Sequence, residues 1–224
     1  MTLQRKIQAA EVSDFLKLVD QLQTVLENCG KTVYRSEPGE AARLIGLLNH
    51  AQLEGMRQRI AAEIAIHAQL VVAHESLNDP KRQVWRFLQM SGLRPCADLI
   101  DKITGDCVVQ IFSKDQMLLF ATTKFYEVIS FTLEQLFSLT WYECTMRDPL
   151  VEQKVAQAMM HSISGEMRHT TCPQIPPHEI QELNSARKIR SILNVLWLSP
   201  IFKDQEVVAA AAIVGGEILG ESHA

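Results

Sequence analysis

The sequence lacks most of the features that mark disulfide-rich, metal-binding or membrane proteins. The chain has five cysteines: Cys29, Cys96, Cys107, Cys144 and Cys172. They are scattered and never form a CxxC pair, so they indicate neither a disulfide framework nor a zinc site. No apolar run is long enough to span a bilayer, and the segment 1–17 is charged and amphipathic, unlike a signal peptide. We therefore expect a cytoplasmic protein with no membrane span.

The charge pattern and the motif content also exclude several functions. The formal net charge is -4, and no stripe of lysine and arginine suits phosphate contacts, which disfavours direct nucleic-acid binding. No nucleophile with its base, no glycine-rich phosphate loop and no paired carboxylates can be picked out. The sequence therefore predicts no catalytic residue and no enzyme.

The histidines do not predict a metal site. His50, His67 and His74 are not spaced by four residues, the spacing that places two imidazoles on one helix face around a metal ion. Glu63 lies one turn before His67, a spacing that predicts an ordinary pair on the helix surface. His74-Glu75 before Pro80 is similar to the phospho-accepting box of histidine kinases, but its spacing differs, so a solvated histidine at a helix end is preferred.

The first part of the chain is predicted to be helical. Apolar residues recur at steps of three and four from Leu3 to Leu26, and Cys29-Gly30 ends this helix. The apolar stripe fits either a helix packed on its own domain or the seam of a homodimer. A second helix is expected from a cap at Ser36 and Pro38 without interruption to about Leu77, with a broad apolar arc that requires at least two neighbours.

Two shorter helices complete this part. Asn78-Asp79-Pro80 predicts the start of a third helix that Ser91-Gly92 ends, and Pro95 to Ile103 predicts a fourth. We expect a domain boundary between about residues 92 and 104. Residues 1–103 would then form a region for dimerisation or for docking a protein partner.

The rest of the chain mixes strands and helices. Cys107 to Ser113 and Met117 to Ala121 predict a β-hairpin. Thr132 to Gln135 is a capping box that starts a short helix, and Asp148-Pro149 caps a longer helix that Gly165 ends. Two strands are expected to follow: Lys188 to Leu198, and Val207 to Val214.

The long connection before the last two strands, the end of the chain and the coverage of the sheet can also be predicted. Pro173 to Ser185 is expected to be a surface loop or a functional lid, and 215–224 a short tail. The last two strands are apolar on both faces, so we expect both faces of the sheet to be covered. Short helices would cover one face, and the N-terminal helices or a second subunit the other.

Between Leu118 and Leu139 the sequence resembles the PAS sensor family. Six residues fit its pattern: Phe120, Phe125, Ile129, Phe131, Thr132 and Leu136. Thr122-Thr123 stands in place of the usual asparagine, and Ser130 in place of the usual glycine. The resemblance implies an α+β fold for residues 104–214, a five-stranded antiparallel sheet with flanking helices, enclosing a pocket for a small ligand or cofactor.

An apolar interior supplies the candidate ligand pocket, although a packed core would use the same residues. The candidates are Ile111, Leu119, Phe125, Ile129, Leu136, Trp141, Met159, Val195 and Trp197. Haem is disfavoured because the resemblance implies an axial histidine near the place where Gln153 stands, whereas His161 comes late in that helix. Flavin is disfavoured because the signature expected around Cys144 is absent. The expected cofactor is none, or an unknown small apolar ligand.

The sequence thus predicts a non-enzymatic signalling protein that forms a homodimer. The PAS-like domain would sense a small ligand or bind a partner, and the N-terminal helices would mediate dimerisation and output. One alternative is a constitutive protein-interaction scaffold with a filled core. A second alternative is a haem or flavin sensor.

Overall fold

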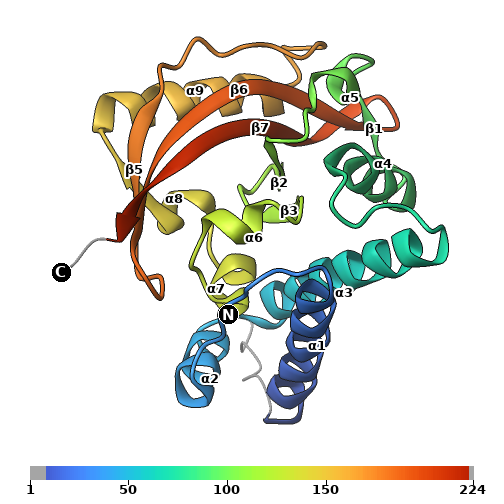
Figure 1. Cartoon of the computed structure of the whole chain (residues 1–224), viewed down its shortest axis with the longest axis vertical. Coiled ribbons are helices and arrows are strands. Elements are labelled where there is room, and N and C mark those ends of the chain that lie inside the picture. Colours follow the sequence, from blue (N-terminus) through green and yellow to red (C-terminus); the bar gives the residue numbers. More distant parts are fainter. Residues whose placement is uncertain (1–8, 222–224) are drawn as a thin grey trace, which may run out of the picture.

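The computed structural model describes residues 9–221, which fold as an N-terminal set of helices followed by a curled antiparallel sheet with further helices (Figure 1). The N-terminal helices are α1 (Ala9–Asn28), α2 (Pro38–Gly46), α3 (His50–Val72) and α4 (Pro80–Met90). Among the described residues, no helix combines the length and the apolarity that crossing a bilayer requires.

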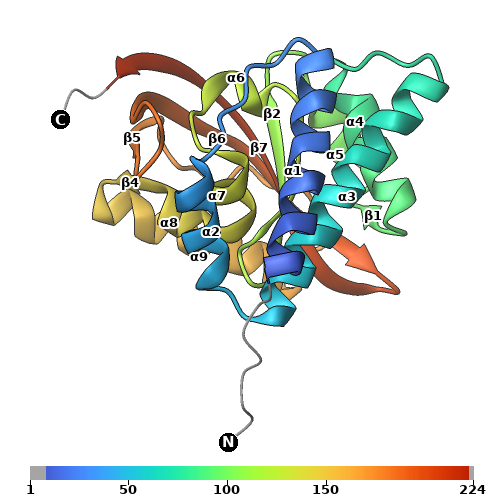
Figure 2. The same ribbon diagram turned by 90° about the horizontal axis from the view of Figure 1, so that it is seen from below.

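Helix α1 packs within the chain through its apolar stripe. Phe15, Val19, Leu22 and Leu26 are fully buried in one cluster with residues of α3 and of α7 (Leu133–Ser138). Figure 2 shows α1 and α3 side by side in front of the sheet. The stripe therefore has its partners inside the chain from residue 9 onward, while Leu3 and Ile7 lie outside the described residues.

The prediction of one uninterrupted helix from Ser36 to about Leu77 is wrong. The chain breaks between α2 and α3, where Asn49 caps α3 by accepting a hydrogen bond from the Gln52 backbone N–H, and the Gln52 side chain accepts one from the Asn49 N–H in return. Ser36 caps no helix, and its hydroxyl instead bonds the Thr132 hydroxyl at 2.8 Å. A local capping motif thus outweighs the continuous apolar pattern.

Helix α4 begins as predicted, and the segment after it is more extended than predicted. Asp79 caps α4 by accepting from the backbone N–H groups of Lys81 and Arg82. Only Leu99–Lys102 is helical (α5) in the stretch predicted as a helix from Pro95 to Ile103. Pro95, the first residue of the predicted helix, belongs instead to β1 (Arg94–Pro95), which pairs with β6.

The sheet has seven strands instead of the five expected. The strands after β1 are β2 (Val108–Ser113), β3 (Leu118–Ala121), β4 (Thr145–Arg147), β5 (His178–Glu182), β6 (Ile189–Lys203) and β7 (Glu206–Glu221). Their order is β3-β2-β7-β6-β5-β4, and every pairing is antiparallel. The predicted hairpin is β2 and β3, so that prediction is confirmed.

Four helices lie between β3 and β5: α6 (Phe125–Val128), α7, α8 (Trp141–Cys144) and α9 (Pro149–Ser164). The capping box of α7 is present in both directions, from Thr132 and from Gln135. Asp148 caps α9, and Gly165 ends it with φ 85, a left-handed conformation that glycine adopts without strain. These local predictions are confirmed.

Three predictions about the end of the chain are wrong. Pro173 to Ser185 is not simply a loop, because it contains β5. Strands β6 and β7 are longer than predicted, and β7 continues through Gly215 and Gly216 where a tail was expected. At Gly216 a Cβ atom would lie 2.4 Å from the carbonyl oxygen of Ile192 on β6. Glycine therefore lets β7 approach β6 closely instead of ending the strand.

Where β2 pairs with β7, the chain itself buries both faces of the sheet. One face, with Ala210, Ala212 and Val214, packs in a cluster with α6, α7 and α9. The other face, with Ala211 and Ile213, packs against the end of α3, α4 and α5. The N-terminal helices thus cover the second face, which is one of the two arrangements that the sequence predicts.

Candidate functional site

A cavity of about 190 Å³ lies between the first face of the sheet and helices α6 to α9. Its walls come from β2, β6 and β7 on one side and from apolar side chains such as Phe125, Leu136 and Met159 on the other. An apolar cavity of about 150 Å³ is enough to hold benzene. The space is therefore large enough for a small molecule, although it is below the roughly 300 Å³ at which sites for drug-sized ligands begin.

Six of the nine predicted pocket residues line this cavity: Phe125, Ile129, Leu136, Trp141, Met159 and Val195. The other three, Ile111, Leu119 and Trp197, lie with the cluster on the opposite face of the sheet. Gln110 and Phe112, the neighbours of Ile111 on β2, both line the cavity. Successive side chains of a strand point to opposite faces, so Ile111 points away from the cavity.

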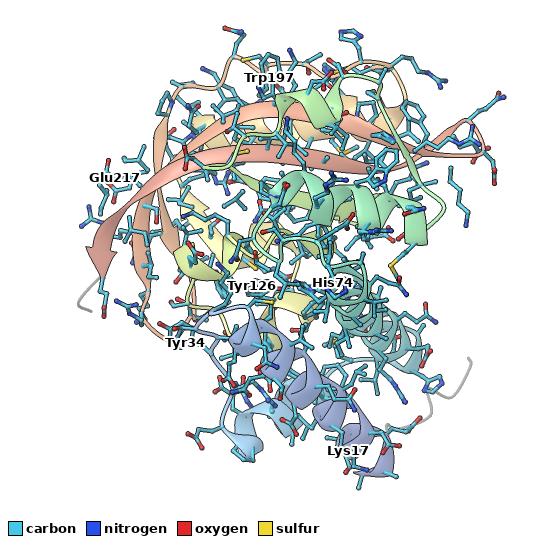
Figure 3. The ribbon with its side chains drawn as sticks, turned by 45° about the vertical axis from the view of Figure 1, so that its right-hand side comes forward. Lys17, Tyr34, His74, Tyr126, Trp197 and Glu217 are labelled. Carbon is cyan, nitrogen blue, oxygen red and sulfur yellow. The ribbon has the colours of Figure 1, made fainter. Side chains whose placement is uncertain are left out.

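Trp197 lies on the opposite face because of a β-bulge. Val195 pairs with Val214 and Trp197 with Ile213, so Leu196 has no partner residue on β7. Without the bulge, Val195 and Trp197 would point to the same face, as predicted. Figure 3 shows Trp197 on one side of the long β6–β7 ribbon and Tyr126 on the other. The ammonium group of Lys102 lies 4.3 Å from the centroid of the Trp197 ring.

The cavity has a polar end where β4 and β5 form the edge of the sheet. Arg147 and Thr145 on β4 line it, and their strand partners Ile180 and Glu182 on β5 line it too. The Arg147 side chain is only 5% exposed and lies 4.9 Å from the centroid of the Trp141 ring. Burial lowers the pKa of Arg147 in spite of the opposing effect of the Glu152 carboxylate. The cavity is therefore amphipathic.

Glu182 is fully engaged by the protein. Its carboxylate accepts hydrogen bonds from the backbone N–H groups of Ser130 and Ile189 and from the hydroxyls of Ser130 and Ser185. These donors join the loop between α6 and α7 to the loop between β5 and β6. Glu182 therefore lines this end of the cavity with a carboxylate whose lone pairs are already used.

Comparison with protein-family models, with curated proteins and with solved structures gives no match. The function must therefore be inferred from the site itself.

Of the three residues weighed for flavin or haem binding, Cys144 lines the cavity, whereas His161 and Gln153 do not. Burial raises the pKa of the Cys144 thiol to about 12, so this thiol is neutral near pH 7. The His161 side chain is 64% exposed near Glu166, and Gln153 is exposed as well. Within residues 9–221, no three histidine, cysteine or carboxylate side chains gather as a metal site requires.

A second group of buried polar side chains lies where α3 meets α6. Glu63 and His67 are buried, so the prediction of a surface pair is wrong. The Tyr126 hydroxyl donates a hydrogen bond to Glu63 Oε1, while Glu63 Oε2 and His67 Nε2 have no hydrogen-bond partner. Burial raises the pKa of Glu63 to about 8 and lowers the pKa of His67. Glu63 is therefore a neutral acid near pH 7.

Sequence reasoning missed the polar end of the cavity because it missed both strands that form it. His178 to Glu182 reads HEIQE, with only one β-branched residue, and Thr145 to Arg147 is too short for a periodic signal. The two strands pair with each other across more than 30 residues of sequence.

Proposed function

We propose that this chain is a non-enzymatic regulatory protein whose residues 104–214 act as a PAS-like sensor for a small ligand. The observation that carries the proposal is the cavity between the sheet and α6 to α9, because two of these helices, α6 and α7, also contact the N-terminal region. The order of a hairpin, short helices, a longer helix and further antiparallel strands supports the PAS-like interpretation. A ligand in the cavity would then reach the N-terminal helices through one layer of side chains.

Several polar contacts join this layer to the N-terminal region, and three of them are made by Glu134, Tyr126 and Thr123. Arg35 Nε donates to Glu134 of α7 at 2.8 Å. The Tyr126 hydroxyl of α6 donates to Glu63 of α3. These contacts make α6 and α7 the route by which an occupied cavity would change the packing of the N-terminal helices.

The third contact uses one of the departures from the PAS pattern. The Gln83 side chain of α4 accepts from the Thr123 backbone N–H at 2.8 Å and donates to the Thr123 hydroxyl at 2.9 Å. Thr122 uses its hydroxyl to accept from the Val109 N–H. Thr122-Thr123 thus binds the start of α6 both to the sheet and to α4.

The N-terminal helices also present apolar side chains that a protein partner would bury. The exposed large ones are Leu47, Val71, Val72, Trp85 and Met90. A partner docking on some of these side chains would provide the output of the sensor. A homodimer remains part of the proposal, although the stripe of α1 is used inside the chain. Light scattering at tens of micromolar tests it, and a monomer would contradict it.

The sensor proposal is tested with a neutral apolar probe and a matched pair of variants. Calorimetric titration of 1-octanol into the full chain should show saturable binding. Ala212→Leu places extra volume in the cavity and should abolish binding, whereas Ala211→Leu on the opposite face should preserve it. Binding should also change the hydrogen exchange of α3 and α4. No binding to the wild type, or equal binding to both variants, would contradict the sensor proposal.

The second candidate function, a scaffold with a filled core, is favoured by the small volume of the cavity. In that case no small molecule co-purifies in native mass spectrometry, and 1-octanol does not bind. A haem or flavin sensor is the third candidate. An absorption spectrum of protein from cells supplied with both cofactors distinguishes it, because a Soret band would show bound haem and a flavin band would show bound flavin.

A further inference from the structure

Arg147 is a buried cation in the wall of a largely apolar cavity. We propose that the cavity selects a small amphiphile with a carboxylate group, and that Arg147 receives this carboxylate. This inference rests on the proposed function of the cavity as a ligand site. It adds the chemical class of the ligand and the residue that recognises it.

The guanidinium group has donors that the protein does not use. Nη2 donates one hydrogen bond, to the Thr145 hydroxyl at 2.8 Å. Nε lies 2.9 Å from Glu152 Oε2 but its N–H is not aligned with that oxygen, so it makes no hydrogen bond. Within the described chain, Nη1 donates to no protein group. A guanidinium has five N–H groups, and of the Arg147 nitrogens Nε is the one that is fully buried without a hydrogen-bond partner, which is costly.

A carboxylate fits these donors better than other small groups. The two η nitrogens present parallel N–H groups that a carboxylate accepts in a bidentate geometry, and such charge-assisted bonds are stronger than neutral ones. The Trp141 ring on the Arg147 guanidinium and the bond to Thr145 fix the side chain in advance. A neutral hydroxyl would satisfy at most one donor and would add no negative charge beside that of Glu152.

The neighbouring carboxylates do not use all the hydrogen-bond donors of Arg147. Glu152 is the carboxylate that acts on Arg147, and it is partly exposed in the first turn of α9, where the helix N-terminus also stabilises its charge. Glu182 lines the same end of the cavity but already accepts four hydrogen bonds from protein donors. Cys144 is a neutral thiol there. Arg147 is thus the group in this wall that has N–H donors without a protein acceptor.

The volume limits the apolar part of the ligand. A cavity of about 190 Å³ is somewhat larger than the roughly 150 Å³ that holds one benzene ring. An apolar body of about eight carbon atoms, or a single substituted ring, fits such a space. Phe125, Leu136, Met159 and Val195 would surround it.

The test compares three probes of equal length on the full chain by calorimetric titration: octanoate, 1-octanol and octylamine. Octanoate should bind about 10- to 100-fold more tightly than 1-octanol, the factor that hydrogen bonds to a charged group supply. Equal affinities for octanoate and 1-octanol would overturn the role of Arg147 and leave the sensor proposal standing. Tighter binding of octylamine would overturn it in favour of a cation. Failure of all three probes to bind would overturn both proposals.

Two variants locate the preference at Arg147. Arg147→Met keeps an unbranched apolar chain beside Trp141, so it should reduce the affinity for octanoate to that for 1-octanol while 1-octanol binding stays within about twofold. Arg190→Met is the matched control, because Arg190 on β6 is a more exposed arginine that is paired with Glu179 on the neighbouring strand β5. It should leave both affinities unchanged. Retention of the octanoate preference in Arg147→Met, with native circular dichroism, would refute the assignment.

Discussion

Replacing Glu63 with glutamine should change how the stability of the protein depends on pH. Glu63 is buried, accepts a hydrogen bond from the Tyr126 hydroxyl, and has its pKa raised from 4.5 to about 8. Between these two values the folded protein keeps the Glu63 proton while the unfolded chain loses it. The free energy of unfolding must therefore fall as pH rises through this range.

The size of the effect follows from the pKa difference. One pKa unit corresponds to about 1.4 kcal/mol, so the full range from pH 4.5 to 8 corresponds to about 4–5 kcal/mol for Glu63. His67 acts in the opposite direction below about pH 6.5, because burial lowers its pKa and the unfolded chain holds its proton more strongly. The window from pH 6.5 to 8 isolates Glu63, with an expected loss of about 2 kcal/mol.

Urea unfolding of the full chain at several pH values between 6.5 and 8 measures this loss. Glu63→Gln keeps an oxygen for the Tyr126 hydroxyl and cannot ionise, so its stability should be constant across the window. Glu54→Gln is the matched control, since Glu54 is an exposed residue of the same helix. It should show the pH dependence of the wild type. A wild type whose stability does not fall between pH 6.5 and 8 would refute the reasoning.

Three further substitutions test the packing by urea unfolding near pH 7. Ala211→Leu should lower the free energy of unfolding by about 1–3 kcal/mol through overpacking against α4 and α5, and by more than Ala212→Leu, which faces the cavity. Gly216→Ala should cost at least as much, because its Cβ atom would meet the Ile192 carbonyl at 2.4 Å; a neutral result would mean that β7 shifts freely. Asn49→Ala should cost about 0.5–2 kcal/mol by removing the cap of α3, and no change would argue against the break before α3.

Local capping motifs were the part of the fold that the sequence predicted best. The Asp148-Pro149 start of α9 and the capping box at Thr132 are as predicted, because a cap is decided by residues within one turn. The same rule applies at Asn49 and Gln52, where the motif was present in the sequence but the apolar periodicity was given more weight.

Features that depend on distant segments could not be predicted in this way. The burial of Glu63 depends on the arrival of Tyr126, 63 residues away in sequence. Trp197 changes faces because Leu196 is accommodated as a bulge, which alternation along one strand does not reveal. Four of the six predicted residues that line the cavity come from the short helices and α9: Phe125, Leu136, Trp141 and Met159.

The length of β7 has a consequence for how the folded protein avoids aggregation. Strand β2 pairs with β7 only from Ala209 to Val214, so from Gly215 to Gly220 the backbone ladder has β6 on one side alone. An open edge of this kind, with Ile218 and Leu219 exposed, invites a strand from another molecule. The charge of Glu217 and the irregular backbone of Gly220, with φ 144, interrupt that edge and shorten the flat stretch onto which a foreign strand can add.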